Sequence, residues 1–176
     1  GLPNKNKCEE ILNASESFSE EESIAICVFD LNNLRNINNN LGHDKGDEYI
    51  RSFAIQLRIA VADEYFVGRD GGDEFIAVLK NVTRAQVEQC LQDIREQTTR
   101  YSKEYPEMPI SYAVGYAMSQ DFEAPTMREL FRYADKNMYI NKNHVKREEA
   151  AAQRQLDYKL LKLLNMHGKN FTDCLY

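Results

Sequence analysis

The chain has 176 residues, of which 43% are hydrophobic and 28% are charged, a composition typical of one soluble domain with a proper core. Its formal net charge of -6, without a clustered basic face, argues against binding to nucleic acid. It contains neither a long apolar run nor a basic leader, so we expect no membrane span or signal peptide and a cytoplasmic location, alone or as the cytoplasmic part of a larger sensor protein.

The first predicted element is a strand over residues 23–30, because its continuous run of β-branched and apolar residues is typical of a central strand covered on both faces. This strand ends at Asp30. A short helix is predicted next, and Gly42 is its predicted C-cap. Three leucines recur at helical spacing along it: Leu31, Leu34 and Leu41.

Asp44 predicts the start of a second helix, and a hairpin is predicted after it. Residues 64–70 and 74–80 form its two strands, around Gly71 and Gly72, which supply the unusual backbone angles of a tight turn. The buried stripe of the second helix is predicted to contain Ile50, Ala54, Leu57 and Val61.

Thr83 predicts the N-cap of a third helix, which ends before Pro106. Residues 110–119 alternate large and small side chains, which predicts a strand with one crowded face and one face that permits close packing. A fourth helix is predicted from about Thr126 through Met138. This order of elements predicts an α+β fold with helices around a mainly antiparallel sheet.

Helix-forming residues follow from Arg147 onward, and three leucines share one face of the helix that they predict: Leu156, Leu160 and Leu163. We therefore expect a domain over residues 1–146 and a helical extension or linker over residues 147–176. The four cysteines form no Cys-x-x-Cys pair, which favours buried thiols in a reducing compartment over disulfides or a zinc site: Cys8, Cys27, Cys90 and Cys174.

Polar residues stand at two positions where the helical pattern favours apolar ones. Asn38 lies on the leucine stripe of the first helix, and Asp47 lies on the line of the second helix's stripe. Each has a structural explanation, because Asn38 can help to end a helix and Asp47 follows Asp44 at the spacing of a capping arrangement. Together, an amide and a carboxylate that face one cleft can instead recognise the edge of a guanine.

Two carboxylates, Asp73 and Glu74, directly follow the paired glycines. They have an ordinary explanation as exposed hairpin charges. Adjacent strand residues point to opposite faces, however, so one carboxylate points to the face of Asp30 if the hairpin lies beside the first strand. Carboxylates at neighbouring strand ends repel each other unless a cation lies between them. Because Mg²⁺ or Mn²⁺ prefers such oxygen ligands and completes its shell with phosphates, the pattern predicts a nucleoside triphosphate site.

The segment GGDEF at residues 71–75 resembles the signature of the GGDEF family of diguanylate cyclases. Three further segments are similar to family motifs: GLPNKNKCEEIL (1–12), FDLNNLRNINNNLGHDKGDEYI (29–50) and YADKNMYINK (133–142). The resemblance covers residues 1 to about 146. It implies a fold like the palm of nucleotide polymerases and class III adenylyl cyclases, and a reaction that converts two GTP into cyclic di-GMP and two pyrophosphates.

The resemblance also implies roles for single residues. Asp30 and Asp73 match the metal-binding carboxylates for Mg²⁺ or Mn²⁺, with the Leu31 carbonyl as a backbone ligand. Glu74 matches a second acidic position, used in catalysis or for a second metal. The guanine readers match Asn38 and Asp47, and the phosphate-binding positions match Gly71, Gly72, Asn33, Leu34, Arg35, Lys142 and Lys146.

The chain departs from the family pattern at several places. Lys146 stands where the family usually has Arg, so a weaker grip on the triphosphate is expected. The family's Arg-x-x-Asp product site reads ADEY, with Ala62 and Tyr65 in place of the Arg and the Asp, so we expect no allosteric product site. Two further positions also differ: Asn32 and Asp70.

The implied mechanism is metal-assisted attack of the 3′-hydroxyl of one GTP on the α-phosphate of another. Because one domain holds one GTP, we expect a catalytic homodimer that is arranged by an upstream sensor domain. Two other functions stay open. A GTP-binding regulatory module without turnover is favoured by the altered basic end and by the helical extension. A purely structural interaction domain leaves the pattern of carboxylates and amides unexplained.

Overall fold

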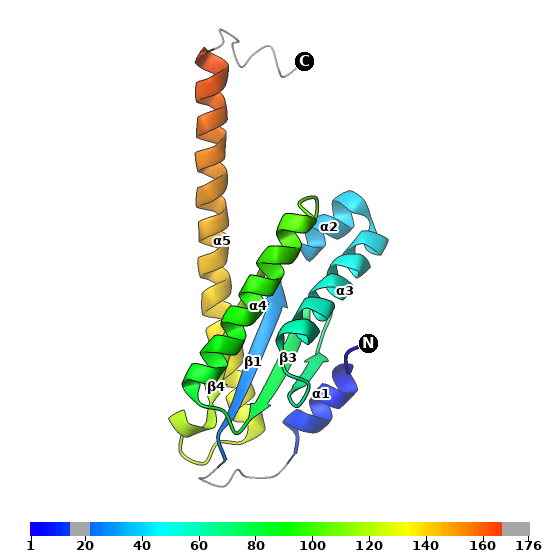
Figure 1. The fold of residues 1–176 in the computed structure, drawn as a ribbon, viewed down its shortest axis with the longest axis vertical. Helices are drawn as coiled ribbons and strands as arrows, with labels where there is room; N and C mark the ends of the chain where they lie inside the picture. Colours follow the sequence, from blue (N-terminus) through cyan, green and yellow to red (C-terminus); the bar gives the residue numbers. More distant parts are fainter. Residues whose placement is uncertain (15–21, 167–176) are drawn as a thin grey trace. The chain divides into compact units, whose positions relative to one another are not determined.

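The computed structural model describes residues 1–14 and 22–166 (Figure 1). The chain divides into two compact units, residues 1–142 and residues 143–176. Within the described residues of the first unit, the strands form one antiparallel sheet in the order β2-β3-β1-β4. The strands are β1 (Ile24–Leu31), β2 (Phe66–Arg69), β3 (Glu74–Lys80) and β4 (Tyr112–Met118).

Helices cover both faces of this sheet, which confirms the predicted α+β fold (Figure 1). Helices α3 and α4 pack on one face, whereas α1 and the first turns of α5 pack on the other. A short helix, α2, and a 3₁₀ turn, η1, complete the described elements. The bounds are α1 (Lys5–Leu12), α2 (Leu34–Leu41), α3 (His43–Ala60), α4 (Arg84–Glu104), η1 (Ser119–Asp121) and α5 (Met127–Met166).

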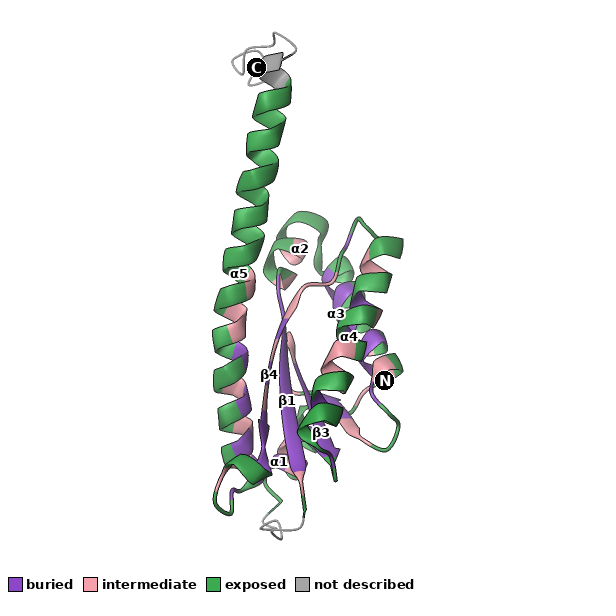
Figure 2. Cartoon of the chain, turned by 60° about the vertical axis from the view of Figure 1, so that its left-hand side comes forward, coloured by how far each residue is buried: buried purple, intermediate pink, exposed green. Residues whose placement is uncertain are grey.

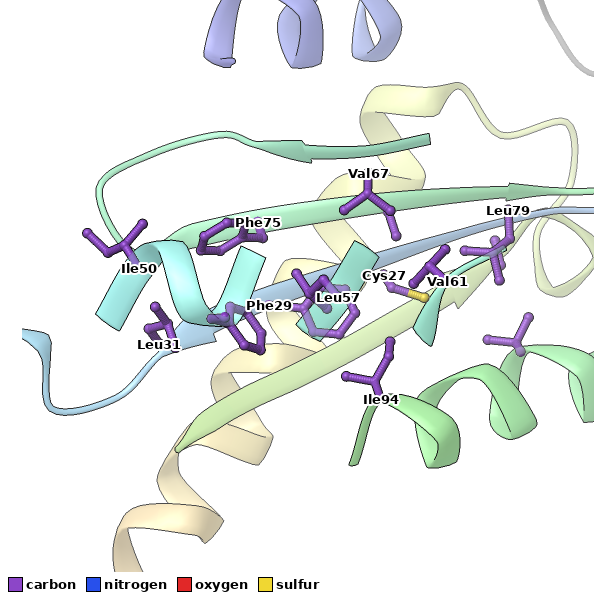
Figure 3. Packing of buried hydrophobic residues seen from close by; sticks show 14 of the residues in the cluster. Cys27, Phe29, Leu31, Ile50, Leu57, Val61, Val67, Phe75, Leu79 and Ile94 are labelled. Atoms are coloured by element: carbon purple, nitrogen blue, oxygen red, sulfur yellow. The ribbon is translucent and has the colours of Figure 1, made fainter. Parts of the chain in front are cut away.

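Strand β1 is buried along its whole length, as its continuous apolar run predicted (Figure 2). Its side chains alternate between the two helical layers. Cys27, Phe29 and Leu31 face the layer of α3 and α4, where they pack among other buried residues (Figure 3). Ile26 and Val28 face α1 and α5. Asp30 has the same parity as Ile26 and Val28, so it lies on the α1 and α5 side of the sheet.

The small residues of β4 allow α5 to pack closely, which confirms the predicted close-packing face. A Cβ atom added to Gly115 would overlap the backbone nitrogen of Met138 and the carbonyl of Ala134. Ala113 and Ala117 flank this position in the same apolar cluster. Strand β4 and helix α5 are therefore in near backbone contact.

The first predicted helix differs from the structure in two ways. Leu31 belongs to β1, because its N–H donates to the Asp73 carbonyl at 2.9 Å and it pairs with Tyr112 of β4. The other two leucines of the stripe, which belong to α2, are not buried: Leu34 is half-buried and Leu41 is 57% exposed. Gly42 ends this helix with a φ of 89°, as predicted.

Three described cysteines are free thiols, and the fourth, Cys174, lies outside the described residues. Cys27 is buried as predicted, Cys8 is buried as well, and Cys90 is half-buried. Burial, together with the nearby Asp70 carboxylate, raises the pKa of Cys8 to about 11.

The second unit contains the later part of α5, and its residues from Asn143 to Leu163 are exposed except for Val145. Residues 147–166 are helical, as their composition predicted. The predicted domain boundary at residue 146 stays a prediction. Among the described helices, none has the length and apolar character required to cross a bilayer.

Candidate functional site

Two carboxylates lie side by side at one end of the sheet. Asp30, one residue before the end of β1, pairs in register with Glu74, the first residue of β3. Asp30 is only 5% exposed. Because Glu74 has the same parity as Ile76 of β3, which faces α1 and α5, both carboxylates lie on that face of the sheet. Glu74 is therefore the strand carboxylate that faces the same way as Asp30.

Asp73 completes this acidic cluster from the hairpin turn. The pKa of Glu74 is raised, first by burial and then by the neighbouring charges of Asp30 and Asp73. Weaker contributions come from Asp135 of α5 and from Asp70. No role was predicted for Asp135, although this residue lies in the segment 133–142 that resembles a family motif.

A lysine from α5 supplies positive charge to the cluster. Lys142 Nζ donates to Asp30 Oδ1 at 2.6 Å, and its side chain is 23% exposed. Lys142 was predicted to bind phosphate, and the structure places it directly at the buried carboxylate of β1. The Lys142 amine therefore offsets part of the negative charge of the cluster.

The paired glycines do not have the backbone angles that were predicted for them. Neither Gly71 nor Gly72 has a positive φ; among the glycines of the described segments, Gly42 has one. The prediction of unusual backbone angles at this turn is therefore wrong. A Cβ atom at Gly71 would lie 3.1 Å from Glu74 Oε2, and a Cβ atom at Gly72 would have no neighbour within 4 Å. The glycines keep the surface beside the carboxylates free of side chains.

Arg69 folds over the same turn. Its Nε donates to the Gly71 carbonyl at 3.0 Å, and its guanidinium donates to the Gly72 carbonyl at 2.8 Å. The Asp70 N–H also donates to the Glu74 carbonyl at 2.9 Å. These bonds fix the turn and hence the position of Asp73 relative to β1.

Asn38 lies against the helix that carries Asp47. A Cβ atom added to Gly46 would overlap the Asn38 side-chain oxygen, so this amide lies against α3 one residue before Asp47. Helix α3 has Gly42 as its N-cap and makes no side-chain capping bond. The capping explanation for Asp47 is therefore not what the structure shows. No role was predicted for Gly46, although it lies in the segment 29–50 that resembles a family motif.

The start of α2 lies directly after β1. Asn33 is its N-cap, with a φ of 66°, and the Asn33 side chain makes no capping hydrogen bond. Leu34 and Arg35 form the first turn. The backbone N–H groups of a helical first turn have no partner within the helix, so they favour an anion.

Asn32 holds the end of β1 in place. This residue is 4% exposed, and its amide nitrogen donates to Ser111 Oγ at 3.0 Å. Its backbone N–H donates to the Ser111 carbonyl at 2.9 Å, and Tyr49 donates to the Asn32 carbonyl at 3.1 Å. The neutral side chain thus joins β1 to the segment that leads into β4.

Other residues singled out in the sequence have different surroundings. Lys146 is exposed and belongs to the second unit. Ala62 is exposed, and Tyr65 is half-buried against the core. Asp63, between them, pairs with Arg58 at 2.8 Å. In the described part of the chain, no three or more His, Cys, Asp or Glu side chains converge in a group that could hold a metal ion by themselves.

Comparisons with known proteins agree with the fold described above. The family model described as "Diguanylate cyclase, GGDEF domain" matches residues 1–148. An uncharacterized membrane protein of Staphylococcus saprophyticus is 30% identical over 150 residues, which cover 81% of this chain and 42% of that protein. One of Staphylococcus haemolyticus is 28% identical with the same coverage. The chain thus spans 42% of the length of these relatives.

Solved structures share the fold. The GGDEF domain of DgcB from Caulobacter crescentus, in complex with c-di-GMP, has a TM-score of 0.69 and 22% identity, with coverage of 81% of this chain and 86% of that one. The active GGEEF domain of a diguanylate cyclase from Vibrio cholerae has a TM-score of 0.60 and 26% identity, with coverage of 69% and 78%.

The relatives correct one prediction. Both are named as membrane proteins, which overturns the cytoplasmic location predicted from the composition. The physical reason is that the apolar content of a segment reports only on that segment. Since the match covers 42% of each relative, composition here carries no information on the other part.

Proposed function

The chain belongs to the GGDEF-domain family of diguanylate cyclases, and from that premise we propose that it condenses two GTP molecules into cyclic di-GMP and two pyrophosphates. The observation that carries this proposal is the in-register pair of Asp30 and Glu74, with Asp73 and Lys142 beside it. This cluster combines hard oxygen ligands with a lysine, which is the combination that a metal-bound triphosphate requires.

Mg²⁺ or Mn²⁺ fits the donor groups. Asp30, Asp73 and the Leu31 carbonyl would hold the ion, and Glu74 would serve as a further acidic ligand or as a catalytic group. All of these donors are oxygens, and few protein ligands are needed because Mg²⁺ keeps substrate phosphates and water in its shell. When bound, the ion offsets negative charge on the reacting phosphates.

The pair of Asn38 and Asp47 would select guanine. The Asp47 carboxylate can accept from N1–H and from the exocyclic amine, and the Asn38 amide, held against Gly46, can complete the edge. Adenine presents an acceptor where guanine presents N1–H, so it would leave the carboxylate facing a lone pair.

The phosphates would lie between the start of α2 and the hairpin turn. The amides around Asn33 and Leu34 are not capped by the Asn33 side chain and can donate to phosphate oxygens. Because Gly71 and Gly72 have no side chains, the backbone of the turn can approach the phosphate oxygens. Arg35 and Lys142 supply positive charge in this proposal, and Lys146 stays a phosphate-binding residue predicted from the sequence alone.

Each domain would hold one GTP, so turnover requires two copies of the chain that face each other. In the proposed reaction, the 3′-hydroxyl of one GTP attacks the α-phosphate of the other, and pyrophosphate leaves. A sensor domain that brings two copies together is part of this proposal, as is the domain boundary after residue 146. The names of the relatives favour a membrane protein as the whole molecule.

A regulatory module that binds GTP without turnover is the second candidate. Lys146 in place of the usual Arg favours it, because a lysine lacks the bidentate geometry of a guanidinium. The two candidates share GTP binding and differ in product formation.

Incubation with GTP and Mg²⁺, followed by chromatography of the products, distinguishes these two candidates. The cyclase yields cyclic di-GMP from the wild-type chain and none from Asp73→Ala, which keeps the fold because Asp73 is half-buried at a turn. Asp30→Ala gives the same loss. Full activity in a folded Asp73→Ala protein would refute the metal site, and GTP binding without product would favour the regulatory module.

A further inference from the structure

Strand β4 lies at one edge of the sheet, and its outer side is contacted by two asparagines of α5. The sheet order places β1 on one side of β4 and no described strand on the other. An edge strand presents backbone N–H and carbonyl groups that require partners. Asn141 Oδ1 accepts from the Val114 N–H at 3.0 Å, and Asn137 Nδ2 donates to the Tyr116 carbonyl at 3.0 Å.

The residue spacings of α5 and β4 allow both asparagine bonds to form at once. Asn137 and Asn141 are four residues apart and lie on the same side of the helix, whereas Val114 and Tyr116 are two residues apart and face the same edge. One amide acts as a donor and the other as an acceptor. The pair therefore fixes α5 along the direction of β4, in addition to the close packing of Gly115 against Met138.

One of these bonds lies next to the acidic cluster. Val114 pairs with Phe29, and its neighbour Ala113 pairs with Asp30. Asn141 immediately precedes Lys142, whose Nζ donates to Asp30 at 2.6 Å. The bond from Val114 to Asn141 thus connects the strand beside Asp30 to the residue directly before Lys142.

We propose that Asn141 is a positioning residue for Lys142: its bond to Val114 holds the helix at the height that brings the lysine amine to Asp30 and to the substrate phosphates. The part that concerns phosphate rests on the proposed function. Asn137 supplies the matched comparison, because its amide bonds to the same strand edge one turn earlier and is not adjacent to Lys142.

Nucleotide binding tests this role. Calorimetry compares GTP with guanosine, which has the same base and no phosphate. Asn141→Ala should weaken GTP binding about tenfold, the loss expected for one misplaced charged hydrogen bond, and should leave guanosine binding unchanged. Asn137→Ala should leave both affinities close to wild type. In a Lys142→Ala background, Asn141→Ala should have no further effect, because the group that it positions is gone.

A second measurement is independent of GTP. Reductive methylation followed by mass spectrometry reports the rate at which the Lys142 amine reacts. We expect slow reaction in the wild type and in Asn137→Ala, because the amine is paired with Asp30, and faster reaction in Asn141→Ala. Asn141→Gln, which moves the amide by one methylene group, should behave like Asn141→Ala and provides a second variant if the first folds poorly.

The two measurements separate failure of this inference from failure of the proposed function. A wild-type chain that binds no GTP would refute the proposed function, while the methylation rates would still support or overturn the positioning role. Equal methylation rates in Asn141→Ala and Asn137→Ala, or an equal loss of GTP and guanosine affinity in Asn141→Ala, would overturn it. Such results would show that Asn141 only supports the fold.

Discussion

Asp70 is a carboxylate with an unfavourable environment. Its Oδ1 atom is buried without a hydrogen-bond partner. Burial raises its pKa above 3.8, and the nearby Glu9 raises it further, although Lys5 and Arg128 act in the opposite direction. The ionised form of Asp70 therefore costs folding free energy at neutral pH.

This environment gives a pH-dependent prediction. A carboxyl whose pKa is higher in the folded state contributes stability below its unfolded value of about 3.8, and that contribution is lost as the pH rises through the folded pKa. Asp70→Asn, which is neutral at all pH values, should therefore raise the melting temperature at pH 7 and should raise it less as the pH falls toward 4. Melting curves across this range check the sign, and a gain that grows toward acid pH would contradict it.

Gly46 leaves room for the Asn38 side chain, because glycine has no Cβ atom. A side chain at this position would overlap the Asn38 amide. Alanine is a better helix former than glycine, so Gly46→Ala should not unfold α3. It should displace Asn38, lower GTP affinity by about tenfold or more through the lost polar match, and reduce the preference for GTP over ATP.

Competition binding with GTP and ATP measures this effect. Asn38→Ala is the matched control, because it removes the same amide directly. The double variant should lose little more than either single variant, since both substitutions remove one interaction. An unchanged GTP preference in Gly46→Ala would show that Asn38 does not recognise the base.

At the scale of the elements, the strands were easier to predict than the helix after β1. Residues 74–80 form β3 as predicted, because a β-branched run between glycines and a capped helix has no competing interpretation. Leu31 fits a helical repeat with Leu34, but its backbone bonds to Asp73 and its pairing with Tyr112 extend the strand. Those partners are distant in the sequence, so local periodicity could not reveal them.

The candidate site was predictable in its residue types and not in its geometry. Alternation required one hairpin carboxylate to point to the face of Asp30, and only the register of β1 with β3 identified it as Glu74. Asp135 and Gly46 take part through contacts between helices and other elements, which periodicity does not report. The Lys142 pair with Asp30 likewise depends on how α5 packs.

Close packing between β4 and α5 gives a prediction about stability. Gly115→Ala should force the helix away from the strand, because the added carbon would overlap backbone atoms of Met138 and Ala134 that cannot rotate aside. Overpacking of this kind costs about 1–3 kcal/mol of unfolding free energy.

Urea denaturation measures this cost. Gly72→Ala is the control, since its added carbon would have no neighbour within 4 Å, and it should change the unfolding free energy by less than about 0.5 kcal/mol. Equal stability of the two variants would show that α5 can shift without cost.

At the scale of the whole molecule, residues 62–65, which precede β2, give a prediction about inhibition by cyclic di-GMP. Ala62 and Tyr65 cannot form a bidentate cationic grip on a guanine or a phosphate, and Asp63, the acidic residue beside Ala62, pairs with Arg58. Any inhibition by cyclic di-GMP should therefore be competitive with GTP. Initial rates at several GTP concentrations check this, and tight non-competitive inhibition would contradict it.

The asparagines on β4 also restrict how two copies can associate. A free strand edge invites pairing with another strand, which leads to aggregation or to dimers that share a continuous sheet. On β4, two outward backbone groups are already engaged by Asn137 and Asn141. At the opposite edge, the Arg69 N–H of β2 donates to the Pro3 carbonyl at 2.8 Å. Extension of the sheet by strand addition at either edge would have to break these bonds, which disfavours dimers that share a continuous sheet.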